Sequence, residues 1–189
     1  MNQIYVYDGP FEKGDKGWTL IREAASRYGG ELDLPYDFSS AEIKRTEKRK
    51  PYFTEIPVEF SLSHSGAMWI CLFSDKQCGL DLQLVEPERK WDVINRKYYK
   101  PEEQHYVELW GVEGFYDIWV RKEAFVKCTG LGFFSEMPSM VDENTDLKKT
   151  IEQNGQIYCF EDLVIAPEVK CAYCVAGVEK ASAELRILG

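Results

Sequence analysis

The stretch "WVRKEAFVK", Trp119 to Lys127, places charged residues within an apolar helical pattern. Its pattern predicts a helix, in which Glu123 and Lys127 lie one turn apart on the same side. The plainly polar side of that helix carries Asp117 and Arg121. An i, i+4 pair of this kind is usually a surface ion pair, but this one is set among apolar residues: Phe115, Trp119, Val120, Ala124 and Val126. Charges in an apolar stripe require partners, because burying an unpaired charge is unfavourable.

Length and composition predict a folded, soluble protein. The chain has 189 residues, of which 44% are hydrophobic and 14% aromatic, enough for one ordinary domain or two small halves packed together. No apolar run approaches the ~20 residues that span a bilayer. The start, "MNQIYVYDGPF", lacks the basic and apolar regions of a signal peptide. We therefore expect a cytoplasmic protein that does not bind membranes.

The six cysteines lie mostly in apolar runs, so we expect reduced thiols in the core. "CAYC" at 171–174 is the one C-x-x-C. A zinc site or a redox role is the alternative, but on a strand these two thiols point to opposite faces and no second pair completes a zinc site.

The formal net charge of −9 argues against a general nucleic-acid binder. Yet "KRTEKRK" at 44–50 gathers five of the 23 lysines and arginines. This cluster is a candidate seat for an anionic small molecule. A solvated helix end, with cations favoured by the helix dipole, is the alternative.

The periodicity predicts an α+β protein made of two small halves in close contact, 1–78 and 79–189. Gly29 and Gly30 are expected to stop the first helix, and Gly130 and Gly132 the last. Expected strands cover 3–7, 58–66, 67–74, 78–85, 155–167 and 170–180, with a further edge strand near 184–189. Expected helices cover 17–30, 87–99, 100–111 and 113–129.

"GLDLQLV" places Asp81 and Gln83 on one face of a strand and three leucines on the other. A buried salt bridge and a metal site are both open for Asp81. Mg²⁺ takes carboxylate oxygens together with substrate phosphates and waters. Glu123 is then the natural second carboxylate, Gln83 offers a neutral oxygen or holds a water, and Lys127 neutralises a phosphate.

His64 lies in "LSHSG" at a strand end, where a side chain can meet a ligand; a purely structural role is the alternative. The segment is not a nucleophile elbow. The sequence has neither a P-loop nor a G-x-G-x-x-G fingerprint. Any phosphate binding must therefore come from side chains.

In order along the chain, these segments resemble motifs of the surfactin-type 4′-phosphopantetheinyl transferases. "RKPYF" at 49–53 is similar to G-K-P, "FSLSHSG" at 60–66 to F-N-[IL]-S-H-[ST], and "CGLDLQ" at 78–83 to V-G-[IV]-D-[IV]-E. "RKYYKPEE" at 96–103 resembles R-F-F-x-x-x-E. "WVRKEAFVKCTGLGF" at 119–133 resembles W-[ST]-x-K-E-A-x-x-K-x-x-G-x-G.

The resemblance implies a monomer of two similar α+β halves packed as a pseudo-dimer, with the active site between them, where coenzyme A and Mg²⁺ bind. It implies transfer of phosphopantetheine to a serine of an acyl or peptidyl carrier protein in fatty acid, polyketide or nonribosomal peptide synthesis. Asp81 and Glu123 would hold Mg²⁺, and Glu123 or a water held by it would be the base. Phosphate and nucleotide contacts would come from Arg45, Lys48, Lys50, Pro51, Ser63, His64 and Lys127, with Lys122 supporting the site.

The sequence departs from the family pattern at Gln83, where the second acid of D-x-E is expected, and at "RKP" in place of G-K-P. Lys13 and Lys16 are further candidates for binding the 3′-phosphate. Apolar residues from 133 to 140 are candidates for contact with the carrier protein. Gln83 also leaves open a coenzyme A-binding or nucleotide-binding regulator that has lost turnover. A structural partner protein, in which each charge belongs to an internal salt bridge, is the third hypothesis.

Overall fold

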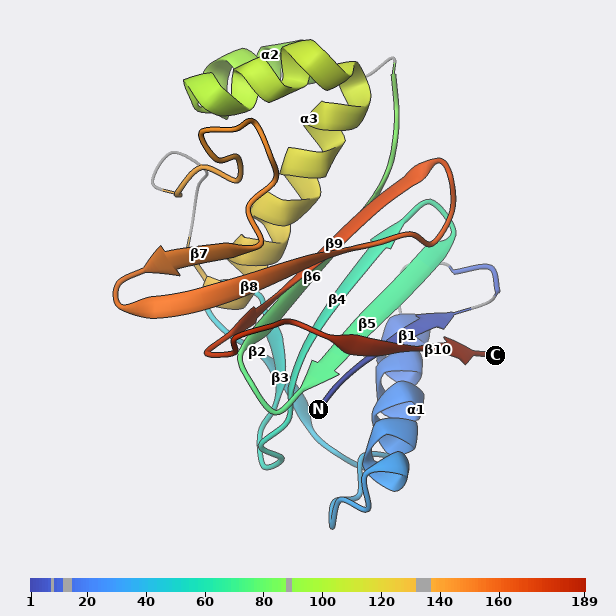
Figure 1. The fold of residues 1–189 in the computed structure, drawn as a ribbon. Coiled ribbons are helices and arrows are strands. Elements are labelled where there is room, and N and C mark those ends of the chain that lie inside the picture. Colours follow the sequence, from blue (N-terminus) through green and yellow to red (C-terminus); the bar gives the residue numbers. More distant parts are fainter. Residues whose placement is uncertain (8, 12–14, 88–89, 132–136) are drawn as a thin grey trace.

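Residues 1–7, 9–11, 15–87, 90–131 and 137–189 are described by the computed structural model (Figure 1). Its three helices are α1 (Asp15–Glu31), α2 (Trp91–Tyr98) and α3 (Pro101–Thr129). The first six strands are β1 (Asn2–Tyr7), β2 (Ile43–Arg45), β3 (Pro51–Phe53), β4 (Glu59–Ser65), β5 (Met68–Ser74) and β6 (Cys78–Leu84). The last four are β7 (Thr150–Gln153), β8 (Gln156–Leu163), β9 (Val169–Ala176) and β10 (Ala183–Leu188).

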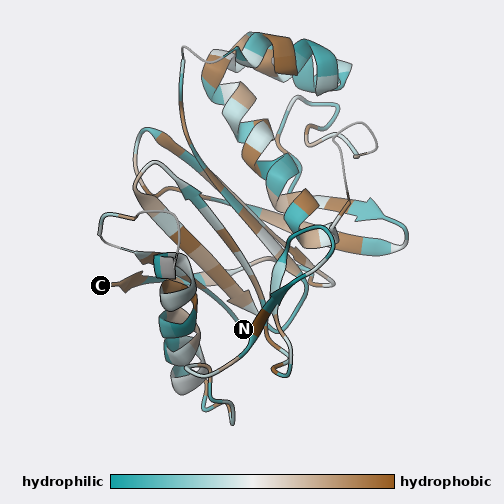
Figure 2. Cartoon of the chain, turned by 180° about the vertical axis from the view of Figure 1, so that it is seen from behind, coloured by the Kyte–Doolittle hydropathy of each residue, from teal (hydrophilic) through white to brown (hydrophobic). Residues whose placement is uncertain are grey.

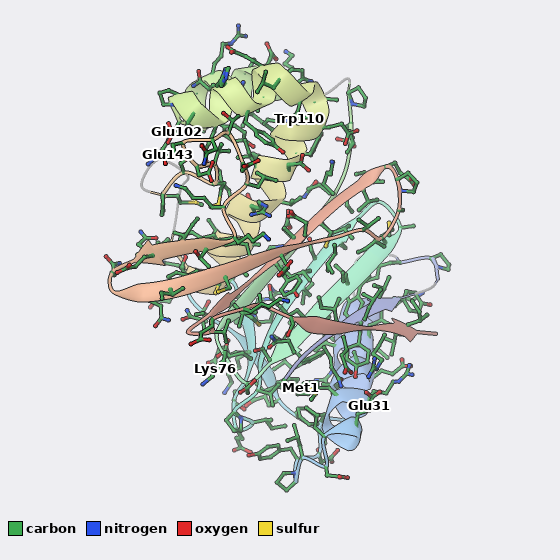
Figure 3. The ribbon with its side chains drawn as sticks, in the orientation of Figure 1. Met1, Glu31, Lys76, Glu102, Trp110 and Glu143 are labelled. Carbon is green, nitrogen blue, oxygen red and sulfur yellow. The ribbon has the colours of Figure 1, made fainter. Side chains whose placement is uncertain are left out.

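The strands form two four-stranded sheets, ordered β10-β1-β5-β4 and β6-β9-β8-β7, and a separate β2-β3 hairpin. The C-terminal strand β10 pairs in parallel with β1, so the edge strand expected near 184–189 lies in the sheet of the N-terminal half. Glu31, labelled in Figure 3, lies at the end of α1. Its carboxylate reinforces this edge, because it pairs with Arg186 of β10 at 3.1 Å. The division into 1–78 and 79–189 stays a prediction. β10 belongs to the second half by sequence but pairs with a strand of the first half.

Three apolar cores separate the layers. Along β5, Trp69, Cys71 and Phe73 pack against α1, while Ile70 and Leu72 face the second sheet. Along β9, Cys174 and Ala176 pack under α3, while the alternate residues face the first sheet. The sheets therefore share one core, and each is covered on its other face by a helix, which confirms the α+β prediction (Figure 1). Figure 2 shows hydrophobic residues concentrated on the central strands.

The cysteine prediction is confirmed, because all six thiols are free and buried. Cys171 faces the core between the sheets and Cys174 the core under α3, as expected for two residues on opposite faces of a strand. None of the helices in the described ranges combines the length and the apolar character that crossing a membrane requires.

Helix α3 is broken at Gly111, whose φ of 62° and ψ of −142° are open only to glycine among ordinary residues. The predicted boundary between residues 111 and 113 corresponds to this break. The C-terminal end is also as predicted: Gly130 is left-handed, with φ 68°, and donates its backbone N–H to Val126 O at 2.7 Å. At the end of α1, in contrast, the helix continues through both glycines to Glu31.

The predicted polar side of the long helix is wrong. Arg121 is only 3% exposed, and its guanidinium binds both carboxylate oxygens of Asp162 on β8 at 2.8 and 2.6 Å. Asp117 pairs with Lys170 of β9 at 2.9 Å. This side of α3 faces the second sheet, and charged partners on that sheet make its burial possible.

Two short polar elements were not predicted as strands. β7 pairs with β8, and the basic segment folds as the β2-β3 hairpin. The alternative of a helix end for 44–50 is therefore wrong. Its turn places Arg49 in the left-handed region, with φ 66°.

Candidate active site

The site begins where α3 approaches β6. A Cβ built on Gly79 would lie 1.9 Å from Ala124 O and 2.4 Å from Cys128 N, so only glycine allows this contact. Asp81 lies two residues farther along β6 on the same face as Gly79. The close approach therefore brings this carboxylate under the turn of α3 that carries Glu123 and Lys127.

Serine hydroxyls join the two sheets where β4 runs beside β6. Ser61 Oγ and Ser65 Oγ accept the backbone N–H groups of Leu80 and Leu84, each at 3.0 Å. Between them, the buried Ser63 hydroxyl donates to Asp81 Oδ1 at 2.8 Å. We call this row of side-chain hydrogen bonds, made by Ser61, Ser63 and Ser65, the serine seam.

Lys127 spans the serine seam. Its Nζ lies 2.6 Å from Asp81 Oδ1 on β6 and donates to Leu62 O on β4 at 3.2 Å. The side chain keeps 28% of its surface exposed. It can therefore meet a ligand while it compensates the buried Asp81.

Asp81 and Glu123 are electrostatic neighbours. Burial raises the pKa of Glu123 above its ordinary value; the Asp81 carboxylate raises it further, and Lys127 opposes the shift. Asp81 Oδ2 is buried without a hydrogen-bond partner in the described part of the chain. An unpartnered carboxylate oxygen beside a second, half-buried carboxylate fits a divalent cation, which takes oxygen ligands. Within the described ranges, no group of three or more His, Cys, Asp or Glu forms a metal site.

A cleft of about 1350 Å³ opens beside Lys127, between the β2-β3 hairpin, β4 and the end of α3. The four residues predicted to meet the nucleotide all line this cleft together with Lys127: Arg45, Lys48, Lys50 and Pro51. A basic hairpin and the lysine of the carboxylate cluster thus share one solvent-accessible space.

The basic side chains are held by contacts on both sides of the cleft. The Arg45 guanidinium lies 4.9 Å from the Trp18 ring of α1. Lys48 donates to Gly130 O at the end of α3. Lys50 Nζ lies 3.0 Å from Glu59 Oε2 and 3.1 Å from Cys78 O. The hairpin is therefore anchored to α1, β4 and α3, which reduces the ordering that a bound anion would require.

The structure also gives the positions of four further candidate residues. The Lys122 ammonium pairs with Glu103 at 2.9 Å, and both side chains are 0% exposed. Gln83 is half-buried on the same face of β6 as Asp81. His64 is half-buried, with its ring centre 5.3 Å from that of Phe11. Lys16 donates to Pro10 O and lies over Tyr7, away from the cleft lining.

Lys13 and the first part of the expected carrier contact, from Phe133 to Glu136, lie outside the described residues. The expectation of an apolar carrier contact is wrong for the two methionines of that segment. Met137 and Met140 are 1% and 0% exposed and belong to the core under α3. They cannot contact a carrier protein in this conformation.

Sequence reasoning missed several neighbours of the cluster. Glu59 neutralises Lys50, and Gln77 Nε2 donates to Cys128 O at 2.6 Å beside the cleft. Neither residue lies in a sequence pattern that indicates a role at the site. The alternating serines of "FSLSHS" do have one, because a period of two places three hydroxyls on one face of a strand.

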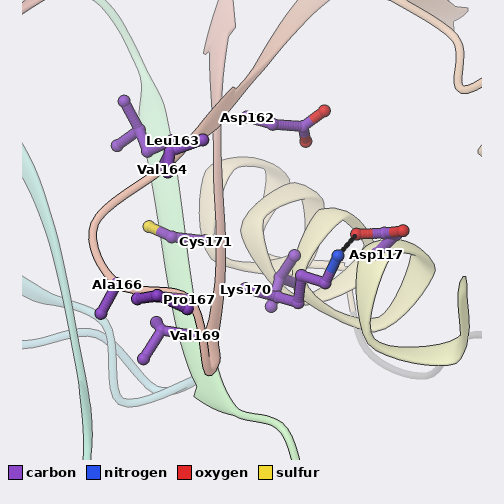
Figure 4. A pocket seen from close by; sticks show the side chains of 10 residues that line it. Asp117, Asp162, Leu163, Val164, Ala166, Pro167, Val169, Lys170 and Cys171 are labelled. Atoms are coloured by element: carbon purple, nitrogen blue, oxygen red, sulfur yellow. Dashed lines mark ion pairs between the residues drawn. The ribbon is translucent and has the colours of Figure 1, made fainter. Parts of the chain in front are cut away.

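A second, smaller cavity of about 270 Å³ lies between α3 and the β8-β9 connection (Figure 4). Lys170 pairs with Asp117 at 2.9 Å, and Arg121 with Asp162. These charges already pair with one another, so none of them is a buried charged atom without a hydrogen-bond partner, as Asp81 Oδ2 is. The large cleft is the candidate active site.

Comparisons with known proteins identify relatives of this chain. The family described as the 4′-phosphopantetheinyl transferase superfamily matches residues 77–174, more than half of the chain. A 4′-phosphopantetheinyl transferase of Bacillus subtilis is 28% identical over 176 residues, which cover 88% of this chain and 77% of the relative. The 4′-phosphopantetheinyl transferase AcpT of Escherichia coli (strain K12) is 35% identical over 95 residues, 47% of this chain and 49% of the relative. A putative 4′-phosphopantetheinyl transferase of Synechocystis is 30% identical over 122 residues, 60% of this chain and 46% of the relative.

Proposed function

Because this chain belongs to the 4′-phosphopantetheinyl transferase superfamily, we propose that it transfers 4′-phosphopantetheine from coenzyme A to a serine hydroxyl of an apo acyl or peptidyl carrier protein. The other product is adenosine 3′,5′-bisphosphate. A single observation supports this reading most: Asp81 Oδ2 is buried and unpartnered beside Glu123 and Lys127, next to a basic cleft.

In this proposal, Asp81 and Glu123 hold Mg²⁺, and Gln83 contributes its amide oxygen or a bound water. When bound, the ion neutralises phosphate oxygens on which negative charge develops during transfer. Two carboxylates rather than three reduce the local negative charge, so we expect weaker Mg²⁺ binding than a third acid would give.

The chain's own residues bind, orient and move a proton. Lys127 can turn from Asp81 toward the pyrophosphate, since its ammonium is partly exposed at the cleft. Glu123 accepts the proton of the carrier serine, directly or through a water. Ser63 orients Asp81 through its hydroxyl, and His64 contacts the phosphate region.

Arg45, Lys48 and Lys50 surround the 3′-phosphate and adenosine end of coenzyme A, with Pro51 alongside. The acidic net charge of the chain makes this local basic surface important, because it supplies the attraction for a polyanion that the whole molecule does not.

Mass spectrometry of apo carrier proteins tests the proposal directly. Carriers from fatty acid, polyketide and nonribosomal peptide systems are each incubated with the protein, coenzyme A and Mg²⁺. A gain of one phosphopantetheine group on at least one carrier, absent when coenzyme A is omitted, supports the activity. No modified carrier in the panel, with a known transferase active in parallel, counts against it.

A coenzyme A-binding regulator is the second candidate, and Gln83 in place of an acid is the feature that favours it. Thermal unfolding with coenzyme A, with and without Mg²⁺, separates the two when combined with the carrier assay. Stabilisation by coenzyme A without any carrier modification would identify a regulator. Stabilisation together with modification identifies the enzyme.

A further inference from the structure

Lys122 and Glu103 form a fully buried ion pair that the proposed chemistry does not use. The two charged atoms lie 2.9 Å apart, and neither side chain is exposed. In an unbroken helix these residues would be separated by about 28 Å along the axis. The contact exists because the chain folds back at Gly111, whose backbone conformation favours glycine. Figure 3 labels Glu102 and Trp110 near the two ends of the first helical segment.

Glu103 connects three parts of the chain. Its Oε2 accepts the backbone N–H of Lys100 at 2.9 Å, at the start of α3. Its Oε1 accepts the backbone N–H of Met140 at 2.9 Å and pairs with Lys122. One carboxylate therefore ties together both segments of α3 and the buried segment around Met140.

Lys122 also lies against an aromatic ring, that of Tyr99. Its ammonium lies 5.5 Å from the centre of the Tyr99 ring. Burial lowers the pKa of Lys122, and Glu103 opposes this shift. Burial raises the pKa of Tyr99, to which the negative charges of both Glu103 and Glu123 add. The ion pair and the half-buried Glu123 thus act on the same tyrosine.

A fully buried ion pair is weak evidence for stability, because desolvation of two charges offsets their attraction. Its geometric demand is strong, since both charged atoms must stay in contact. Glu123 follows Lys122 directly on the helix, so fixing Lys122 also fixes the rotation of the turn that carries Glu123.

We propose that Glu103 and Lys122 are positioning residues: their ion pair sets the rotation of the second segment of α3 and so aims Glu123 at Asp81. This inference rests on the proposed transfer reaction. It assigns Glu103 a part in that reaction and gives Lys122 a partner inside the protein instead of a contact with coenzyme A. A carboxylate displaced by about 1 Å can reduce the rate about a hundredfold, so a small rotation has a large effect.

The test compares stability with rate. Lys122→Met leaves the Glu103 carboxylate uncompensated and lowers the melting temperature. The double variant Glu103→Gln with Lys122→Met has no orphaned charge and recovers much of that loss. We expect its kcat to stay at least about tenfold below the parent value, with the KM for coenzyme A within twofold. The Mg²⁺ concentration for half-maximal rate should rise, because Glu123 is misplaced.

Recovery of both melting temperature and kcat in the double variant would overturn the proposal, because the pair would then matter only as compensated charge. Glu103→Asp covers the case in which the double variant fails to fold. It keeps both charges and shortens one side chain, so a folded Glu103→Asp protein with the parent kcat and Mg²⁺ dependence also overturns the proposal.

Lys170→Met is the matched control. Lys170 pairs with Glu113 and Asp117 of the same helix, each at 2.9 Å, but contacts a different side of it. We expect a lower melting temperature and an unchanged kcat. A fall in kcat as large as that of Glu103→Asp would show that any ion pair of this helix affects the rate, and would overturn a specific role for Glu103 and Lys122.

The parent protein distinguishes failure of this inference from failure of the proposed function. If the parent modifies no carrier, the proposed function is wrong. The inference is then judged by Mg²⁺ binding to the parent and Glu103→Asp in isothermal titration calorimetry. Tighter binding to the parent supports it, and equal or absent binding overturns it.

Discussion

Lys127 Nζ lies 2.6 Å from Asp81 Oδ1 and thereby joins the end of α3 to β6 across the serine seam. The pair couples stability to activity: the lysine compensates a buried carboxylate and also lies at the edge of the cleft. Breaking the pair from one side differs from removing it, since only the first leaves a buried charge without a partner.

Lys127→Met should lower the free energy of unfolding by about 1–3 kcal/mol, because Asp81 stays buried without its cation. Asp81→Asn combined with Lys127→Met should recover most of this loss but remain inactive. Urea unfolding and the carrier assay measure the two effects. A Lys127→Met protein as stable as the parent would show that Asp81 finds another partner.

Glu123→Gln should reduce transfer at least about a hundredfold while the fold stays intact. Burial raises the pKa of Glu123 in the folded protein, so its charged form is less stable there than in water. An uncharged amide of similar shape should therefore be at least as stable. The control is Glu108→Gln on the exposed surface of the same helix, which should change neither rate nor melting temperature. Normal transfer by Glu123→Gln would remove Glu123 from its assigned role.

Gly79→Ala should destabilise the protein by about 1–3 kcal/mol or more, since its Cβ would collide with backbone atoms of α3. Transfer should fall as α3 moves away from Asp81. Gly30→Ala is the contrasting change. Apart from its chain neighbours and the nearby backbone of its own helix, no atom of the described residues lies within 4 Å of the added Cβ, and alanine in a helix should stabilise by about 0.5–1 kcal/mol. Equal stability of the two variants in thermal unfolding would contradict the close approach.

Arg45→Ala should raise the KM for coenzyme A about tenfold and leave kcat nearly unchanged, because one charged contact to the 3′-phosphate is lost. Dephospho-coenzyme A, which lacks that phosphate, should show no such change. Lys44→Ala is the matched control: Lys44 neighbours Arg45 on β2 but pairs with Glu42 and does not line the cleft. A similar rise in KM for both substrates would place Arg45 elsewhere than at the 3′-phosphate.

The candidate site was predictable to the extent that it depends on local spacing. The period of the helix places Glu123 and Lys127 on one side, and the period of the strand places Asp81 opposite the leucines of β6. The basic cluster was also visible as an anion seat. Its hairpin was not, because strands of three residues carry too little pattern to distinguish them from a helix end.

The destinations of Arg121 and Lys122 could not be predicted, because each depends on a distant partner. Arg121 seemed to belong to a solvated face, but Asp162 lies far along the chain and compensates it on β8. Lys122 was expected to support the site, but its partner could not be predicted, because the break at Gly111 brings Glu103 to it. A lysine next to a glutamate has the same local sequence pattern whether it meets a ligand or a buried carboxylate.

Periodicity and residue type thus sufficed for the α+β class, the main strands and helices, and the acids and cations that could serve a phosphate reaction. Which of those charges meet was decided by packing. Gly79 allows α3 to pack on β6, and the serine seam holds β4 beside β6. The fold-back at Gly111 brings Glu103 to Lys122, and both side chains are buried. The physical reason is the separation along the chain of the residues involved. Side-chain direction follows from neighbouring dihedral angles, whereas a charge pair requires two remote segments to approach within about 3 Å.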